Sequence, residues 1–175
     1  ILGFSQLLIE KIQEEDYEGI EKYGRIIQRS SQQSMDLLGN LMEWSQSQTG
    51  KIEYNPVKVE VAELINEITE LLQFSALQKA ITISKELPDN IQVLGDKDMI
   101  STIMRNLVSN AIKFTHAGGT IVISAEKKQN ELMICVSDNG LGIKKKNIDK
   151  LFRIEESITT PGTKMEKGTG LGLIL

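Results

Sequence analysis

A long amphipathic segment near the start of the chain is the strongest constraint on its fold. From residue 20 to about residue 47 the sequence has no proline, and apolar or small side chains recur at steps of three and four residues. This spacing places them on one side of an α-helix, so the segment predicts a single long helix. The face consists of Ile20, Tyr23, Ile27, Ser31, Ser34, Leu38, Leu41 and Met42.

A shorter apolar run precedes this segment. Apolar residues recur at helical spacing over residues 1–12, and an acidic run at 14–16 then indicates a turn. Two adjacent helices of this kind form an antiparallel hairpin with too little apolar core to stand alone. The sequence therefore predicts pairing with a second copy into a dimeric four-helix bundle. The alternative is a hairpin that packs on its own domain.

A change of composition after residue 50 indicates a second domain. Gly50 and Pro56 interrupt the helical pattern, and short β-type runs then alternate with helical ones. A chain of 175 residues has room for a small helical element and one compact α/β unit. We expect the two domains at residues 1–50 and 51–175.

The second domain mixes helical stripes with an antiparallel strand pair. A helix is expected over about residues 61–80, with the apolar stripe from Leu64 to Leu72. A second helix, capped by Asp96 or Asp98, is expected to run to about Phe114. Its apolar stripe consists of Met99, Ile100, Ile103, Met104, Leu107 and Ala111. Strands are expected from residues 81, 91, 119 and 131, with a turn at 127–130 and Cys135 as a small core residue. This mixture predicts an α+β fold in which helices cover one face of a sheet, an α/β two-layer sandwich.

Charge and hydropathy exclude two classes of partner. The 24 acidic and 20 basic side chains give a net charge of -4, so no overall positive field exists to attract nucleic acid. No apolar run approaches the roughly 18 residues of a membrane span, so we expect no membrane contact by this chain.

A polar edge on the helix that ends near Phe114 is the first candidate for ligand chemistry. Asn106, Asn110 and Lys113 follow at i, i+4 and i+7, within about 60° of arc on the helix surface. Amide oxygens suit Mg²⁺ and an ammonium suits phosphate oxygens. By themselves, three residues of such common types are more often a solvated edge.

Two further segments point to a nucleotide. The strand from residue 131 runs into DNGLGI at 138–143, where a buried carboxylate of Asp138 can accept from the exocyclic amine of adenine. Alone, this segment is more often a turn. GTGLGL at 168–173 can surround oxygen anions with backbone N–H groups, although it matches neither the P-loop nor the G-x-G-x-x-G spacing.

Taken in order, these segments resemble the boxes of sensor histidine kinases. NLVSNAIKF at 106–114 resembles the N box, DNGLGI the first glycine box, LF at 151–152 the F box and GTGLGL the second glycine box. ILGFSQLL at the start resembles the stretch after the H box, and LLGNLMEWSQSQTGKI at 37–52 resembles the second helix and its linker. The resemblance therefore covers essentially the whole chain.

This resemblance implies a dimerisation and phosphoacceptor hairpin joined to an ATP-binding domain of the GHKL (Bergerat) type. ATP and Mg²⁺ are the implied cofactors: Asn110 would coordinate Mg²⁺, Asn106 and Lys113 would hold phosphates as the catalytic candidates, and Asp138 would recognise adenine. The segment from Arg153 to Gly168 would be the ATP lid. The other implied nucleotide-binding residues are Gly140, Gly142, Phe152, Gly168, Thr169, Gly170, Leu171 and Gly172.

The implied reaction transfers the γ-phosphoryl of Mg-ATP to a bundle histidine and then to an aspartate of a response regulator. The implied partners are a second copy through the hairpin and a receiver domain, in the cytoplasm, with a parent that can be membrane-anchored. The family's phosphoacceptor histidine belongs before Ile1, and we expect truncation at both ends. The single histidine, His116, lies in an expected loop and is not expected to accept phosphate.

Two other functions stay open. GHKL hydrolases resembling gyrase or mismatch-repair proteins place a glutamate base four residues before the Mg-binding asparagine. That position is Asn106 here, and an amide cannot accept a proton, which favours a kinase. The third alternative is a dimerisation or nucleotide-binding module without catalysis.

Overall fold

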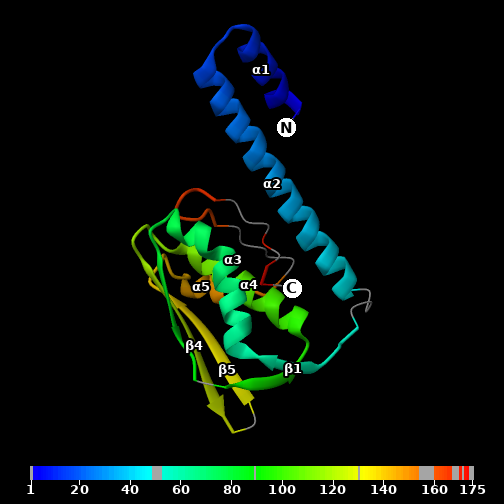
Figure 1. Cartoon of the computed structure of the whole chain (residues 1–175), viewed down its shortest axis with the longest axis vertical. Coiled ribbons are helices and arrows are strands. Elements are labelled where there is room, and N and C mark those ends of the chain that lie inside the picture. The colour runs from blue at the N-terminus through cyan, green and yellow to red at the C-terminus, as the bar shows by residue number, and fades with distance from the viewer. Residues whose placement is uncertain are drawn as a thin grey trace. The chain divides into compact units, whose positions relative to one another are not determined.

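The chain forms two compact units, Ile1–Gln48 and Thr49–Leu175 (Figure 1). The structure is a computed structural model that describes residues 2–48, 53–88, 90–129, 131–153, 160–166, 170, 172 and 173. Among the described helices, none combines the length and the apolar composition needed to cross a lipid bilayer.

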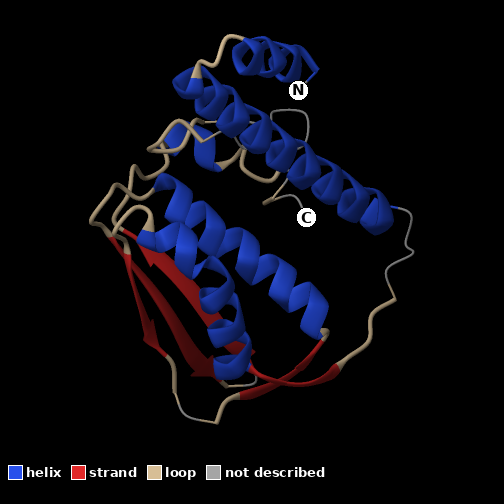
Figure 2. Ribbon diagram, turned by 45° about the horizontal axis from the view of Figure 1, so that its top comes forward, coloured by secondary structure: helices blue, strands red, loops and turns tan. Residues whose placement is uncertain are grey.

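The first unit consists of two helices, α1 (Leu2–Gln13) and α2 (Tyr17–Gln48), joined by a short turn. Both helices that the sequence predicts are therefore present. Helix α1 runs back along the first turns of α2 (Figures 1 and 2). The rings of Phe4 and Tyr23 stack there with their centroids 6.2 Å apart. Many apolar side chains of α2 stay exposed in this unit, among them Leu37, Leu38, Leu41 and Met42.

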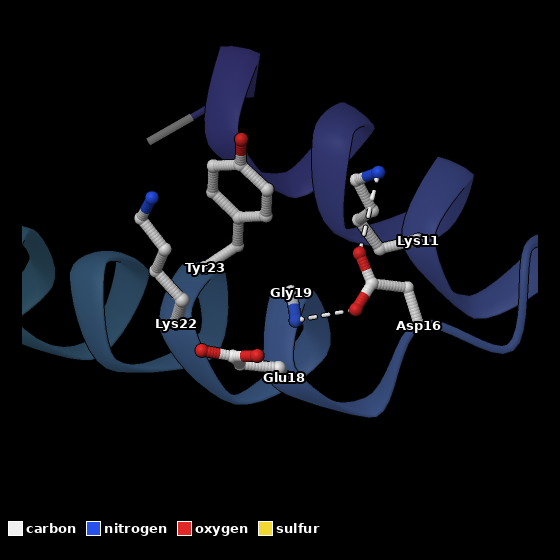
Figure 3. Close-up of a pocket in the computed structure, with 6 residues that line it drawn as sticks. All are labelled: Lys11, Asp16, Glu18, Gly19, Lys22 and Tyr23. Atoms are coloured by element: carbon white, nitrogen blue, oxygen red, sulfur yellow. Dashed lines mark hydrogen bonds and ion pairs between the residues drawn. The ribbon is translucent and has the colours of Figure 1, made fainter.

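The turn between α1 and α2 is held by one carboxylate, that of Asp16 (Figure 3). It caps α2 by accepting from the Gly19 amide at 3.0 Å, and it lies 3.3 Å from the Lys11 ammonium. These two contacts lower the pKa of Asp16 below its ordinary value. A small open pocket of about 210 Å³ lies here, lined by Lys11, Asp16, Glu18, Gly19, Lys22 and Tyr23, none of which is a candidate nucleotide-binding residue.

The second unit contains two sheets. Strands β2 (Thr82–Glu86), β4 (Thr120–Lys128) and β5 (Glu131–Asp138) form one sheet in the order β2-β4-β5, with β2 parallel and β5 antiparallel to β4. Strands β1 (Val57–Glu60) and β3 (Gln92–Gly95) form a short antiparallel pair. The sequence pattern predicts β3 but not β1.

The described residues of the second unit also form three helices: α3 (Val61–Leu77), α4 (Lys97–Phe114) and the single turn α5 (Lys145–Ile148). Figure 2 shows α3 and α4 on one face of the three-stranded sheet. The predicted α+β mixture with helices on one face is therefore confirmed. Between these layers lies the core, which consists mainly of Val61, Leu64, Ile65, Ile68, Met104, Val108, Ala111, Ile112, Ile121 and Ile123.

The structure corrects three predicted burials. Leu71, expected in the apolar stripe of α3, is 67% exposed, and Ile103 on α4 is 52% exposed. Cys135 is also exposed, so its assignment to the core was wrong. Side chains of a strand alternate between faces, and in β5 it is Leu132, Ile134 and Val136 that pack against the core. Cys135 points to the opposite face.

The start of α4 is fixed by the side chain of Asp96, one of the two predicted caps. One carboxylate oxygen accepts from the amides of Asp98 and Met99, each at 3.0 Å. The other oxygen accepts from the Asn55 amide at 2.9 Å, which ties the chain before β1 to this helix. The Asn55 and Met99 amides are the main cause that lowers the pKa of Asp96 below its ordinary value.

Asp96→Ala is expected to lower the thermal unfolding midpoint of the second unit by about 5 °C, because three amides lose their acceptor. Because the pKa of Asp96 is lowered in the folded chain, its ionised carboxylate stabilises the fold fully at any pH above the ordinary pKa of an aspartate. This stabilisation is lost as the pH falls through the lowered pKa. The difference in unfolding midpoint from wild type, measured by circular dichroism, should therefore stay constant from pH 7 to about pH 4 and narrow below it. Asp98→Ala is the control, and an equal shift in both variants would contradict the capping role.

Candidate functional site

The polar edge of α4 forms as the sequence predicts. Asn106, Asn110 and Lys113 all lie on this helix and are partly exposed. The buried stripe of the same helix, which comprises Met104, Val108, Ala111 and Ile112, faces the core. Because the apolar stripe fixes the rotation of α4, the amides and the ammonium are left at the border between core and solvent.

The turn after β5 packs against the C-terminal end of α4. The Leu141 amide donates to the Phe114 carbonyl at 3.1 Å, and the Asn139 side chain accepts from the Thr120 amide at 2.9 Å. These bonds place Asp138 beside the end of α4. Its side chain accepts from the Gly140 amide at 2.9 Å but is exposed, so the expected burial of this carboxylate is wrong for the structure described.

Glycine is required at position 140 for steric reasons. A Cβ atom there would overlap the Phe114 carbonyl oxygen and would lie 2.8 Å from the Asp138 carboxylate. Gly142 differs, because its φ of 63° lies in the left-handed region and a Cβ atom would meet open space. The first glycine segment thus combines one close approach to α4 with one unusual backbone conformation.

The second glycine segment also reaches α4. A Cβ atom on Gly172 would lie 3.2 Å from the side-chain oxygen of Asn106, so the backbone passes directly beside this amide. Gly170 adopts a φ of 75°. Phe152 has a ring that is 72% exposed. The remaining predicted residues, Gly168, Thr169 and Leu171, lie outside the described residues.

Lys113 lies in a crowded position at the end of the polar edge. Its ammonium lies 4.8 Å from the centroid of the Phe114 ring, and its stem would be 2.6 Å from a Cβ atom on Gly162. Partial burial lowers the pKa of Lys113, Glu166 opposes this effect, and the nearby charge of Lys79 adds to it.

Sequence reasoning missed three residues beside Lys113, namely Lys79, Thr163 and Glu166. The Lys79 side chain is only 4% exposed and forms an ion pair of 2.7 Å with Glu166. The Thr163 amide donates to the Lys113 carbonyl at 3.0 Å. No sequence pattern marks Lys79, because a lysine at a helix end is ordinarily a solvated side chain.

The side chains along α4 and the turn after β5 fit a nucleotide with a hard cation. Amide oxygens, an ammonium and an exposed carboxylate match the cation, the phosphates and the adenine amine respectively. Because Gly140 and Gly172 approach α4 closely and carry no side chain, it is their backbone atoms that lie beside this helix. In the described part of the chain, no three His, Cys, Asp or Glu side chains gather as a metal site.

Comparison with known proteins identifies a family and several relatives to which this chain is similar. Residues 95–175 match the family described as histidine kinase-, DNA gyrase B-, and HSP90-like ATPase. The sensor-like histidine kinase SenX3 of Mycolicibacterium smegmatis is 28% identical over 92% of this chain and 42% of its own length. The catalytic domain of histidine kinase ThkA matches 70% of this chain and 78% of its own, with a TM-score of 0.59 and 26% identity.

The comparisons support a histidine kinase catalytic domain of the GHKL type. A second ThkA structure, solved in complex with response regulator protein TrrA, covers 91% of this chain and 46% of that one with a TM-score of 0.72. At 22% identity it shows likeness of fold. The chain spans between 21% and 42% of the length of the first curated relatives it matches.

The region that matches the family begins at Gly95, next to the cap of α4. It contains every predicted site residue, from Asn106 to Gly172. Lys79 lies outside the matched region, on the connection from α3 to β2.

Proposed function

We propose that the second unit binds Mg-ATP along the polar edge of α4 as the catalytic core of a sensor histidine kinase. The observation that carries this proposal is the approach of both glycine segments to the same helix, Gly140 at Phe114 and Gly172 at Asn106. The family match over residues 95–175 supports a nucleotide at this position. We infer a Bergerat-type two-layer fold for residues 51–175.

Each predicted side chain has a role in this proposal. Asn110 would hold Mg²⁺ through its amide oxygen, Asn106 and Lys113 would hold phosphate oxygens, and Asp138 would accept from the adenine amine. Bound Mg²⁺ supplies charge that neutralises the phosphate oxygens. Gly140, Gly142 and the segment 168–172 would bring backbone amides to the nucleotide, with Phe152 beside it.

The polar edge favours a kinase over a hydrolase. A GHKL hydrolase needs a proton acceptor four residues before its metal-binding asparagine, and Asn106 offers only an amide there. His116 is exposed in the loop after α4 and does not lie on a helix. The histidine substrate is therefore assigned to a helical bundle and the final acceptor to a receiver aspartate.

The first unit is proposed as the dimerisation and phosphotransfer hairpin, residues 1–50. Its support is the exposed apolar surface of α2, where Leu38 and Met42 are 54% and 62% exposed in the single chain. Pairing with a second copy would cover this surface. The ThkA complex with the response regulator TrrA supports a receiver domain as the other partner.

Calorimetric titration with a non-hydrolysable ATP analogue and Mg²⁺ tests the proposal directly. The chain should bind the ATP analogue and should bind the matching GTP analogue much more weakly, because guanine has an acceptor where adenine has a donor. Circular dichroism establishes that the protein is folded. A folded chain that binds neither nucleotide would contradict the proposal and would favour a dimerisation module without catalysis.

A further inference from the structure

A buried ammonium joins two segments of the second unit to the end of α4. Lys79 follows α3, and its Nζ atom donates to the carbonyls of Ile112 at 2.8 Å, Lys113 at 2.9 Å and Thr115 at 3.5 Å. The last carbonyls of a helix lack intrahelical partners and carry partial negative charge. The Lys79 ammonium therefore satisfies the C-terminal end of α4.

The same ammonium contacts the segment 160–166. Its Nζ atom lies 2.7 Å from the Thr163 hydroxyl oxygen and 2.7 Å from a carboxylate oxygen of Glu166. The Thr163 hydroxyl in turn donates to the Thr115 carbonyl at 2.8 Å. Glu166 is the one anionic partner of Lys79 among these contacts. Burial acts to raise the pKa of Glu166, but the bonds from Lys79 and from backbone amides together lower it below its ordinary value.

Segment 160–166 is also ordered within itself. The Gly162 amide donates to the Glu166 carbonyl and the Met165 amide to the Gly162 carbonyl, each at 2.9 Å. The Lys164 amide donates to the Glu166 carboxylate at 2.7 Å, and the Lys164 ammonium donates to the Gln78 carbonyl at 2.7 Å. Glu166 thus holds both the segment and Lys79.

The energetics make this contact more than a surface ion pair. An ammonium that is 4% exposed cannot be solvated by bulk water, so it needs protein acceptors and a compensating charge. Carbonyls of α4 supply acceptors, but the charge comes from Glu166 in segment 160–166. Without Glu166, Lys79 would be a buried cation with neutral partners only.

We propose that Lys79 and Glu166 anchor segment 160–166 to the end of α4 and thereby fix its position beside Lys113. Lys79 is in this sense a positioning residue, which acts through the surroundings of Lys113 and touches no nucleotide itself. The inference rests on the proposed function, because the position of this segment affects nucleotide binding only if Lys113 holds phosphate.

Hydrogen exchange of the 175-residue chain without nucleotide tests the anchor. In Glu166→Gln and Thr163→Val, the amides of Gly162, Thr163 and Met165 are expected to exchange about tenfold faster than in wild type. Glu67→Gln is the matched control, because Glu67 pairs with Lys97 at 3.0 Å on the exposed surface. The control should leave exchange of these amides unchanged.

A second measurement tests positioning. Affinity for the ATP analogue, measured by calorimetry with Mg²⁺ at a temperature where circular dichroism shows the variants folded, should fall about fivefold in Glu166→Gln and stay constant in Glu67→Gln. Lys79→Met should likewise show faster amide exchange and lower affinity for the ATP analogue. In the double variant Lys79→Met/Glu166→Gln, the amides of Gly162, Thr163 and Met165 should exchange no faster than in Lys79→Met alone. If Lys79→Met does not fold, the Glu166 and Thr163 variants still decide the question.

The outcomes separate the two proposals. Unchanged exchange in Glu166→Gln and Thr163→Val would overturn the anchor, and global unfolding of both variants would show a general core contact instead. Faster exchange with unchanged affinity would overturn positioning. A wild-type chain that binds no ATP analogue would refute the proposed function, and positioning with it, whereas exchange would still decide whether the anchor exists.

Discussion

Asp138→Asn is expected to weaken binding of the ATP analogue by roughly 10- to 100-fold. The substitution keeps the side-chain oxygen that accepts from the Gly140 amide, so the turn after β5 should persist. It removes the negative charge and presents an NH₂ group that can face the adenine amine as a second donor. Calorimetry with Mg²⁺ gives the affinity, and circular dichroism establishes that the variant is folded.

Asp149→Asn is the control for this experiment. Asp149 is an exposed carboxylate that follows α5, and its replacement changes the net charge by the same amount. The control should bind the ATP analogue like wild type. Equal affinity of Asp138→Asn and wild type would show that Asp138 does not recognise adenine, whatever the chain binds.

Ile121→Ala is expected to destabilise the second unit by about 2–5 kcal/mol. Ile121 is fully buried in β4, the central strand, where it is paired with Ile83 of β2 and Asp138 of β5. Its truncation removes apolar contacts and leaves a cavity that the sheet and helices cannot close completely. Urea unfolding followed by circular dichroism measures the loss of free energy of unfolding.

Leu94→Ala is the matched control, because Leu94 lies on β3 with 73% of its side chain exposed. Its replacement should change the free energy of unfolding by no more than about 0.5 kcal/mol. If Leu94→Ala lost as much free energy of unfolding as Ile121→Ala, strand formation and not the burial of the side chain would determine the loss in both variants. A small loss in both variants would contradict the assignment of the core.

Local patterns predicted the parts of the fold that are regular over many residues. The period of α4 over 18 residues established both its buried stripe and the polar edge with Asn106, Asn110 and Lys113. The pair of β4 and β5 followed from two β-type runs separated by a short turn. Strand β1 was missed, because its four residues are defined by pairing with β3 more than thirty positions away, as in Val59 with Val93.

The candidate site was predictable only in part, for a physical reason. The resemblance to histidine kinases marked Asp138 and the glycine segments, which stand as proposals until they are tested. Lys79 was beyond reach, because its burial depends on acceptors from residues 112–115 and 163–166, which are distant in sequence. A composition or period cannot reveal a contact that three separate segments create together.

The C-terminal end of α4 constrains how this chain tolerates insertions and deletions. The Phe114 carbonyl accepts from the Leu141 amide, and the Lys113 carbonyl accepts from the Lys79 ammonium and the Thr163 amide. One residue added or removed inside α4 would rotate that end by about 100° and shift it by about 1.5 Å. The turn after β5 and segment 160–166 would then both lose their hydrogen-bond partners on α4. By contrast, a residue inserted at 129–130 would lengthen only the connection between β4 and β5. Length variation among related chains should therefore be rare in α4 and common at that connection.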